Sequence, residues 1–483
     1  MDLVVGVDLA TAAVRAVAAG GDGKIHAEST TRLSPPCSPR PGWVEQDART
    51  WWPAVEGALR KLTSALARRS HRVVALSVCA TSGTVVAVDA RGAPLGPALT
   101  YADQRATREA EKAQAADTGR WTALGLRVQP FSGLAKWGWL AAQPGACSRA
   151  ARLAHASDVV VAQLVGGLVP TDWSSALKSG YDPLNLEWSI RALSALGIPL
   201  HLVPEVMPPA TAVGTVSAEA AGSTGLPRGC HVRLGTTDAC AAQLAAGADS
   251  PGRFVSVLGT TLVLKGASPD LVADSTGAVY SHRHPLGWWL PGGASNTGGS
   301  VLSSWFPGRD LKSLDREALR HGPARSVAYP LVGRGERFPF VAGDAEGFVL
   351  DDGHGGVDRY RAALEGVAFV ERLGYEHLAR LGAPAEGRIS TTGRGSTSRV
   401  WNAIRATVLG VPLVARADAT TARGACILAA AGTLHPDLAS AAAAMGAPGE
   451  PVEPLAEERE PLEHSYRRMV AELTERGWLA PGP

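Results

Sequence analysis

The chain has 483 residues, which is long for a single hydrophobic core and suits two domains. Hydrophobic residues make up 45% of the chain and charged residues 19%, a composition that excludes disordered and fibrous proteins. The 47 Lys and Arg residues nearly balance the 45 Asp and Glu residues. The formal net charge of +2 therefore gives no electrostatic reason to expect nucleic acid or an anionic membrane as a partner.

Missing motifs exclude several functional classes. No lysine stands in a Gly-Lys-Ser/Thr triplet, which excludes a Walker-type phosphate loop, and the six cysteines show no CxxC spacing. We interpret these cysteines as reduced thiols of an intracellular protein rather than as disulfides or zinc ligands. The start of the chain lacks the basic segment of a signal peptide, and no run of about 20 apolar residues is present. We therefore expect a cytoplasmic protein that does not enter a membrane.

The first half of the chain alternates predicted strands and helices. Strands are expected at 4–11, 13–19, 24–31, 73–78 and 85–88, because these extended runs are bounded by turn residues. A Pro-rich loop at 34–41 leads to Asp47. This residue is expected to cap a helix at 48–69, whose apolar residues recur at helical spacing.

The second half repeats this pattern. A strand at 254–258, a turn of small and polar residues and a strand at 262–264 echo the opening hairpin. Helices are predicted at 359–381 and 399–409. Strands mixed with helices in each half indicate an α/β fold. We expect one domain at 1–230, a second at 231–440, and a loose tail at 441–483 with a helix at 462–476.

The string Gly235-Thr236-Thr237-Asp238 is the first candidate for chemistry. It stands between a predicted strand and an Ala-rich helix, and a carboxylate at that position can accept a proton from a substrate hydroxyl. The same string is compatible with Asp238 serving only as the N-cap of a helix at 239–246. The local sequence leaves both interpretations open.

Asp8 and Thr11 are a second candidate, at the end of the first predicted strand. A carboxylate there suits Mg²⁺ held partly through water, and a hydroxyl beside backbone amides suits phosphate oxygens. The alternative is that Asp8 only satisfies the amides of a local turn.

Turns of small residues are a third candidate. They let backbone N–H groups approach a phosphate or a nucleobase without a Cβ in the way, although each is also a common loop sequence. A separate segment at 291–299 is dense in Gly and hydroxyl groups and predicts a loop that lines a ligand. The turns follow predicted strands and contain Gly259, Thr260 and Thr261 in one case, and Gly393, Arg394 and Gly395 in the other.

Taken in chain order, these strings resemble the FGGY family of carbohydrate kinases, within the actin-like ATPase superfamily. The resemblance runs from residue 1 to about residue 432. No single string is decisive, but their order along the chain is specific. Lys136 and Trp139 match the family's Lys-x-x-Trp pattern, and Asp238 falls at the position of its catalytic base. The other matching strings are 6–11, 42–47, 171–176, 258–261, 363–369 and 391–396.

The resemblance implies an ATP-dependent sugar kinase that uses Mg²⁺, with two actin-like (ribonuclease H-like) domains and a catalytic cleft between them. Asp238 would act as the base, Asp8 would hold Mg²⁺ or contact the sugar, and Asp8, Ser82, Asp103 and Asp238 would bind the sugar. The residues implied to bind ATP are Thr11, Gly259, Thr260, Thr261, Gly393, Arg394 and Gly395.

The nearest likeness within the family is to a D-ribulose kinase-like branch. It is carried by the strings 80–86, 176–181, 292–296, 329–330 and 334–339, and it implies that D-ribulose is converted to D-ribulose 5-phosphate. Asp103-Gln104-Arg105 is similar to a xylulokinase string instead, so D-xylulose is the second candidate. The implied partners are the sugar and ATP, bound by a monomer or a homodimer.

Two departures from the family pattern favour a different class of protein. Ala10 stands where the family usually has Gly, and Arg394 interrupts the usual glycines of the adenosine segment. A chain weakened in this way would bind a sugar or a nucleotide as a sensor, without kinase activity. The kinase is favoured by polar residues that are retained together: Asp8, Thr11, Asp238 and Thr260.

Overall fold

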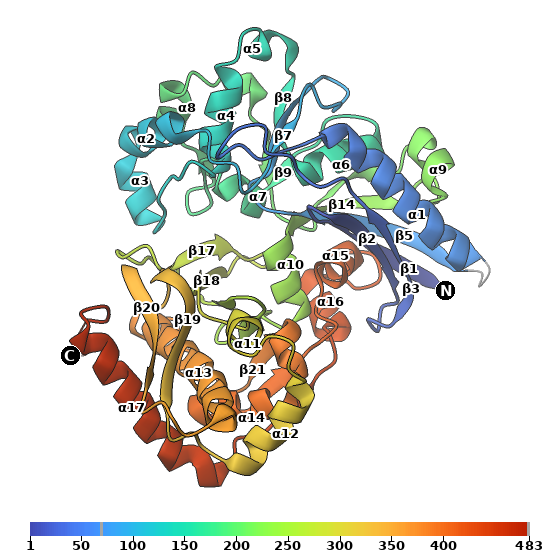
Figure 1. Ribbon diagram of the computed structural model, residues 1–483. Coiled ribbons are helices and arrows are strands. Elements are labelled where there is room, and N and C mark those ends of the chain that lie inside the picture. The colour runs from blue at the N-terminus through green and yellow to red at the C-terminus, as the bar shows by residue number, and fades with distance from the viewer. Residues whose placement is uncertain (68–70, 481–483) are drawn as a thin grey trace. The chain divides into compact units, whose positions relative to one another are not determined.

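The computed structural model describes residues 1–67 and 71–480, and the chain falls into two compact units (Figure 1). Unit 1 contains Met1–Ala245, His282–Gly287 and Ala419–Gly446, and unit 2 contains Ala246–Ser281, Trp288–Asp418 and Ala447–Pro483. Residues 68 and 69 of the first expected helix, and residues 481–483 of the expected tail, lie outside the described residues. Among the described helices, none has both the length and the hydrophobicity needed to cross a bilayer.

A six-stranded sheet forms the centre of unit 1, in the order β13-β14-β5-β1-β2-β3. Its central strands are buried on both faces, which is why they read as nearly continuous apolar runs. The opening strands and turns of the sequence analysis are confirmed here. The strands are β1 (Asp2–Leu9), β2 (Ala13–Ala19), β3 (Ile25–Arg32), β5 (Arg72–Ala80), β13 (Ala212–Thr215) and β14 (His231–Thr237).

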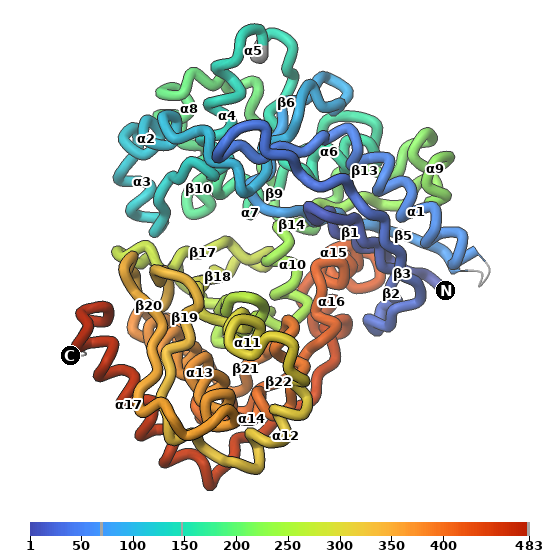
Figure 2. The backbone as a smooth tube through the Cα atoms, viewed as in Figure 1, coloured from blue at the N-terminus to red at the C-terminus, as the bar shows by residue number. Residues whose placement is uncertain are grey.

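Helices cover this sheet, and one of them comes from far along the chain. Helix α15 (Thr421–Ala430) lies beside β1, as the backbone trace in Figure 2 shows. A Cβ on Gly6 would lie 1.9 Å from the carbonyl oxygen of Ala422, so the close packing of α15 on β1 requires glycine there. The other helices around the two faces of this sheet are α1 (Trp51–Ala67), which follows the turn η1 (Ala48–Thr50), α6 (Ala156–Val165), α9 (Ala218–Thr224), α10 (Asp238–Ala245) and α16 (Leu438–Met445).

A smaller subdomain of unit 1 is built on a four-stranded sheet in the order β4-β7-β6-β8. Its core contains the buried rings of Trp121 and Trp137. The strands are β4 (Glu45–Gln46), β6 (Val85–Val88), β7 (Ala98–Leu99) and β8 (Arg152–His155), with the short pairs β9 (Thr171–Asp172) and β12 (Val206–Met207), and β10 (Tyr181–Asp182) and β11 (Glu187–Trp188). The helices are α2 (Thr107–Ala116), α3 (Thr118–Ala123), α4 (Gly133–Ala141), α5 (Ala146–Arg149), α7 (Trp173–Leu177), α8 (Ile190–Ala195) and η2 (Leu200–Leu202).

Unit 2 is centred on strands that are neighbours in the order β18-β16-β15-β21-β22-β23. Its core packs helix α13, which is buried over most of its length, against this sheet and against the C-terminal helix α17. The strands are β15 (Phe254–Leu258), β16 (Leu262–Gly266), β18 (Trp289–Ala294), β21 (Ile389–Thr392), β22 (Leu413–Ala415) and β23 (Glu450–Val452), with β17 (Tyr280–Arg283) beside β18 and a separate hairpin of β19 (Val327–Glu336) and β20 (Ala342–Leu350). The helices are α11 (Ser300–Trp305), α12 (Leu311–His321), α13 (Gly356–Arg380), η3 (Arg394–Thr397), α14 (Arg399–Leu409), η4 (Ala456–Glu458) and α17 (Arg459–Glu475).

Both units share one strand arrangement. In unit 1, β1 pairs antiparallel with β2 and β2 with β3, while β14, β5 and β1 run parallel. In unit 2, β15 pairs antiparallel with β16 and β16 with β18, while β15, β21 and β22 run parallel. The repeated topology confirms what the two similar hairpins indicated. It is the actin-like α/β arrangement that the family resemblance implied.

The units differ from the expected domain bounds in two places. Strand β14 and helix α10, which were expected to open the second domain, belong to unit 1, and so do residues 419–446. The tail is not loose, because β23 joins the sheet of unit 2 and Leu462, Met469 and Leu473 of α17 are buried in its core. The bounds of the units depend on contacts between strands and helices from distant parts of the chain. Local composition cannot predict those contacts.

Candidate active site

The ends of three parallel strands bring the predicted residues of unit 1 together. Strands β1, β5 and β14 are neighbours in the sheet, so their carboxyl ends lie at one edge. Asp8 is the next-to-last residue of β1, Ser82 follows β5, and Asp238 follows β14 directly. In open α/β sheets, ligands bind outside the carboxyl ends of such strands.

Asp238 is the first residue of α10, with no loop between this helix and β14. Its Oδ1 accepts a hydrogen bond from the backbone N–H of Ala239 at 2.8 Å, and the side chain stays partly accessible. Burial raises the pKa of Asp238 above its usual value, while the N–H groups of Ala239 and Ser82, the charge of Lys178 and the hydroxyl of Thr81 oppose that shift. A raised pKa suits a carboxylate that accepts a proton during catalysis.

Asp8 is the second carboxylate at this edge, and it is only 4% exposed. Its Oδ2 lies 3.3 Å from the guanidinium of Arg15 on the neighbouring strand, and its Oδ1 is buried without a hydrogen-bond partner. Burial, and then the negative charge of Asp238, raise the pKa of Asp8 to about 6, against the opposing effect of Arg15. The two carboxylates are therefore close enough to influence each other's charge.

Buried hydroxyl groups without partners surround these carboxylates. Within the described residues, Ser82 Oγ, Thr236 Oγ1 and Thr237 Oγ1 are buried and make no hydrogen bond, like Asp8 Oδ1. A buried polar atom left without a partner costs about 1–3 kcal/mol. Several such atoms at one sheet edge indicate a place where a polar ligand completes their hydrogen bonds.

Thr11 lies at the same end of the sheet. The amide nitrogen of Gln46 donates to the carbonyl oxygens of Thr11 and Ser34, both at 2.9 Å, which fixes the segment after β1. Thr11 also lines one small recess together with Thr81 and Thr84. The loop at 42–47 therefore supports the segment that follows β1.

Asp103 is placed differently from the other predicted sugar residues. It has no exposed surface, and its carboxylate accepts hydrogen bonds from the N–H of Val44 at 2.6 Å and from the guanidinium of Arg105. The Arg105 guanidinium also pairs with Glu45 and stacks on the ring of Trp43. Both oxygens of Asp103 are thus occupied, so the geometry supports a role in shaping this loop rather than direct contact with a sugar.

The predicted nucleotide residues of unit 2 also come together. Gly259, Thr260 and Thr261 form the turn between β15 and β16, and the N–H of Gly259 donates to the carbonyl of Thr261 at 3.0 Å. A Cβ on Gly393 would lie 2.6 Å from the carbonyl oxygen of Leu258, which immediately precedes that turn. The absence of a side chain at Gly393 thus lets the two predicted segments pack against each other.

Arg394 opens the short turn η3 and is exposed. Its stacking on a nucleobase, or obstruction of one, stays a prediction.

The glycine-rich segment at 291–299 is a loop only in its second half, residues 295–299, and the contact of that loop with a ligand stays a prediction. Residues 291–294 belong to strand β18. A Cβ on Gly292 would lie 2.1 Å from the carbonyl oxygen of Leu264, and one on Gly293 would lie 2.2 Å from the ring of Phe338. These glycines allow close packing inside unit 2.

The donor set at the sheet edge of unit 1 fits Mg²⁺ better than a metal bound by protein ligands alone. Among the described residues, no three His, Cys, Asp or Glu side chains form a group that could hold an ion. Asp8 and Asp238 offer two carboxylates, and Asp8 has an unpartnered oxygen. Mg²⁺ commonly binds to one or two carboxylates, completed by water and substrate phosphates.

Local sequence reasoning did not single out several residues of this edge. Thr236 and Thr237 stand in the string that was selected for Asp238, but nothing in that string shows that their hydroxyls are unpartnered. Arg15 was missed because its contact with Asp8 depends on the pairing of β1 with β2. In the predicted hairpin Arg15 is the residue opposite Asp8, and that pairing could have identified it from the sequence.

A hydrogen-bonded Ser–His–Asp chain in unit 1 is structural. His155 Nε2 lies 2.9 Å from Ser179 Oγ, and its Nδ1 lies 3.1 Å from Asp158. Ser179 has no exposed surface, so no substrate can reach its hydroxyl. The chain instead fixes the turn after α7, which carries Lys178.

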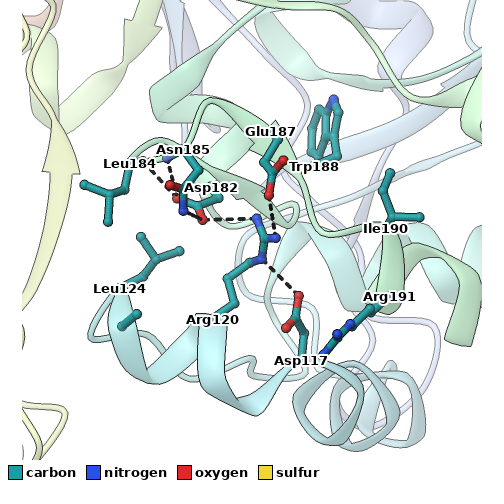
Figure 3. A pocket seen from close by; sticks show the side chains of 11 residues that line it. Asp117, Arg120, Leu124, Asp182, Leu184, Asn185, Glu187, Trp188, Ile190 and Arg191 are labelled. Atoms are coloured by element: carbon teal, nitrogen blue, oxygen red, sulfur yellow. Dashed lines mark hydrogen bonds and ion pairs between the residues drawn. The ribbon is translucent and has the colours of Figure 1, made fainter.

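The pocket in Figure 3 lies in the subdomain of unit 1 and has a volume of about 480 Å³. Three carboxylates surround its central Arg120 guanidinium, namely Asp117, Asp182 and Glu187, at 2.7–3.0 Å. Arg120 is already paired with three carboxylates, so its own charge is not available to an anionic ligand, although Arg191 also lines the pocket. We therefore place the candidate site at the sheet edge with Asp8 and Asp238.

Comparison with known proteins shows similarity over nearly the whole chain. Residues 3–245 match the N-terminal domain and residues 254–433 the C-terminal domain of the FGGY family of carbohydrate kinases. The chain is 28% identical to a glycerol kinase of Gloeobacter violaceus over 456 residues, which cover 89% of this chain and 88% of that protein. It is 29% identical to a xylulose kinase of Streptomyces rubiginosus over 350 residues, covering 70% and 68%. The crystal structure of xylulose kinase from Rhodospirillum rubrum superposes with a TM-score of 0.87 at 28% identity, covering 98% of both chains.

Proposed function

Because the chain belongs to the FGGY family of carbohydrate kinases, we propose that it transfers the γ-phosphate of ATP to a hydroxyl of a ketopentose, with D-ribulose the first candidate. Carbohydrate kinases are phosphotransferases with an alcohol group as acceptor, and this chain is one of them. The observation that supports the site best is the set of unpartnered buried oxygens next to Asp238 at the sheet edge of unit 1.

In this proposal, unit 1 binds the sugar. Asp238 accepts the proton of the attacking hydroxyl, and its raised pKa makes it a better proton acceptor than an ordinary aspartate. The hydroxyls of Ser82, Thr236 and Thr237, which have no partner among the described residues, form hydrogen bonds with the sugar or with water bound to it. The network from Asp103 to Arg105 holds the neighbouring loop without touching the substrate.

Unit 2 binds ATP in this proposal. The backbone N–H groups around Gly259–Thr261 and Gly393–Gly395 approach the phosphates and the nucleoside, and Thr11 of unit 1 contributes to phosphate binding. Asp8 holds Mg²⁺ through its unpartnered oxygen, directly or through water. When bound, Mg²⁺ neutralises charge on the phosphate oxygens.

D-ribulose and D-xylulose differ in the configuration of one carbon, and both remain candidates. D-ribulose is supported by the strings at 80–86 and 176–181. D-xylulose is supported by the similarity to two xylulose kinases. Thr84 and Val85 are short and buried, so this part of the chain supplies no long polar side chain for a sugar hydroxyl.

The test is ADP release with Mg-ATP and D-ribulose, D-xylulose, L-ribulose, ribitol, glycerol or gluconate as acceptor. We expect turnover with one ketopentose and a loss of about 10²-fold or more in Asp238→Asn. Asp270→Asn, which changes an exposed carboxylate of unit 2, is the matched control and should keep its turnover.

Two results would contradict the proposal in different ways. Near-normal turnover in Asp238→Asn would remove Asp238 as the base. No turnover with any acceptor, while ATP or a sugar still raises the melting temperature, would favour the sensor, because binding to the folded state stabilises it.

A further inference from the structure

Lys136 is a lysine without any exposed surface. It lies in helix α4, where Gly133 to Gly138 are all buried. Its ammonium group donates to the carbonyl oxygens of Gly83 and Thr100, the latter at 2.8 Å. Fully buried lysines are rare unless they are paired, and the acceptors at Gly83 and Thr100 are neutral carbonyl groups.

Burial of this charge is unfavourable. Burial lowers the pKa of Lys136 to about 7, although the carboxylate of Asp103 opposes that shift. An apolar side chain of similar length would fill the same space without the desolvation cost of an ammonium group. The hydrogen bonds of Lys136 therefore hold the carbonyl groups of Gly83 and Thr100, which an apolar side chain of the same size could not do.

The two carbonyl groups belong to loops that are distant in the sequence. Gly83 lies in the left-handed conformation, with φ of +78°, in the turn that carries Ser82 and Thr84 after β5. Thr100 follows β7 and is tied to Val44 through both its N–H and its hydroxyl, at 3.0 Å each. Lys136 therefore fastens the loop of Ser82 to a second, independently anchored loop.

The same helix also holds the segment of Lys178. The N–H of Leu134, in the first turn of α4, donates to the carbonyl oxygen of Lys178 at 3.0 Å. The charge of Lys178 in turn lowers the pKa of Asp238. Helix α4 thus contacts the backbone of two segments that bear on the candidate site, at Gly83 and at Lys178.

We infer that Lys136 is a positioning residue of the sugar site, which fixes the Ser82 hydroxyl relative to Asp238 by holding the carbonyl oxygens of Gly83 and Thr100. The inference rests on the proposed function, because it assumes that Ser82 faces the sugar. Lys136 contacts the backbone of the two loops and not the substrate. Its loss therefore acts on the precision of sugar binding, whereas ATP binding is unaffected.

The test uses Lys136→Met in the full chain, with Lys112→Met as the matched control on the exposed face of α2. We expect the KM for the sugar to rise about tenfold or more, because small misplacements of binding groups weaken productive binding strongly. The KM for ATP should change less than about twofold. Hydrogen exchange should accelerate at 80–86 and 98–104 and stay unchanged elsewhere in unit 1.

Lys136→Gln is the second variant. Lys136→Gln retains a donor and should fall between the wild type and Lys136→Met, and it replaces that variant if Lys136→Met does not fold. Equal increases in both KM values, or unchanged exchange at 80–86, would overturn the positioning role. The exchange experiment needs no substrate, so it tests the role of Lys136 even if no sugar is phosphorylated. The absence of phosphorylation would contradict the proposed function instead.

Discussion

Asp8 illustrates how a carboxylate that we propose for chemistry can oppose folding. It is 4% exposed, and within residues 1–67 and 71–480 one of its oxygens lacks a partner and its ion pair is with the largely exposed Arg15. Burial and the charge of Asp238 hold its pKa at about 6, above the ordinary 3.8. The folded state therefore binds the Asp8 proton more tightly than the unfolded state, so folding is favoured below pH 3.8 and that contribution is lost between 3.8 and about 6.

Because folding raises the pKa of Asp8, we predict that Asp8→Asn increases the free energy of unfolding and lowers activity. At pH 7.5 the wild type carries an ionised, buried carboxylate, and removing it should raise the free energy of unfolding by up to about 2–3 kcal/mol. Thermal denaturation at pH 7.5 and pH 4 measures the effect, which should shrink at the lower pH. A destabilised Asp8→Asn at pH 7.5 would show that the carboxylate is better satisfied than its environment indicates.

At the residue scale, the sequence predicted the charged groups but not their surroundings. Asp8 and Asp238 could be selected because each follows small residues at a strand end. The unpartnered state of Thr236 and Thr237, and the occupied oxygens of Asp103, depend on contacts with distant segments. No local string records those contacts.

Among the elements of unit 2, one buried ion pair connects the strands that precede both predicted nucleotide segments. Glu371 of α13 pairs with Arg405 of α14, and neither has exposed surface. Glu371 also accepts from Ser256 of β15, while Arg405 donates to Thr391 of β21 at 2.9 Å. The four residues join two helices and two strands at the centre of the unit.

We predict that Glu371→Leu destabilises unit 2 by about 3–5 kcal/mol, because it leaves the Arg405 guanidinium buried without its counter-charge. The double variant Glu371→Leu/Arg405→Leu should lose less than Glu371→Leu alone, since no uncompensated charge remains. Urea denaturation of the wild type and both variants measures these differences. Exposed pairs such as Arg60 with Glu56 supply the comparison, with an expected loss of about 1 kcal/mol or less. Additive losses in the double variant would contradict this account.

Elements with a strong apolar period were predicted well, and elements defined by packing were not. The strand at 254–258 and the helix at 399–409 appear with the expected bounds. The segment at 291–299 was assigned to a loop because of its density of Gly and hydroxyl groups, but its first four residues are strand β18. In the structure those glycines allow β18 to lie against Leu264 and Phe338. Glycine is required there by contacts with distant residues, which the local sequence does not show.

At the scale of the whole molecule, the predicted sugar and nucleotide residues divide between the two units, Thr11 excepted. Asp8, Ser82 and Asp238 belong to unit 1, and the turns around Thr260 and Gly393 belong to unit 2. The sequence predicted two α/β domains correctly. It could not predict that residues 419–446 return to unit 1, because α15 is recognised as part of that unit only through its contact with β1.

This division predicts a separable pattern of ligand protection. D-ribulose alone should slow hydrogen exchange at 81–84 and 236–239, and ADP alone should slow it at 258–261 and 393–396, because amides near a bound ligand open less often. Exchange measured by mass spectrometry with each ligand singly provides the test. Protection by ADP confined to unit 1 would contradict the assignment of the nucleotide to unit 2.

The discontinuity of the units has a consequence for how the protein is made. Each unit is assembled from three stretches of the chain, and α15, which packs on β1, begins at Thr421. At common rates of translation, roughly 20–80 seconds separate the synthesis of β1 from that of α15. Throughout that interval the face of β1 that packs on α15, where Gly6 lies, is exposed to solvent. A chain terminated near residue 245 would lack α15 and keep that face of β1 uncovered, so we expect it to be less stable than unit 1 of the full chain.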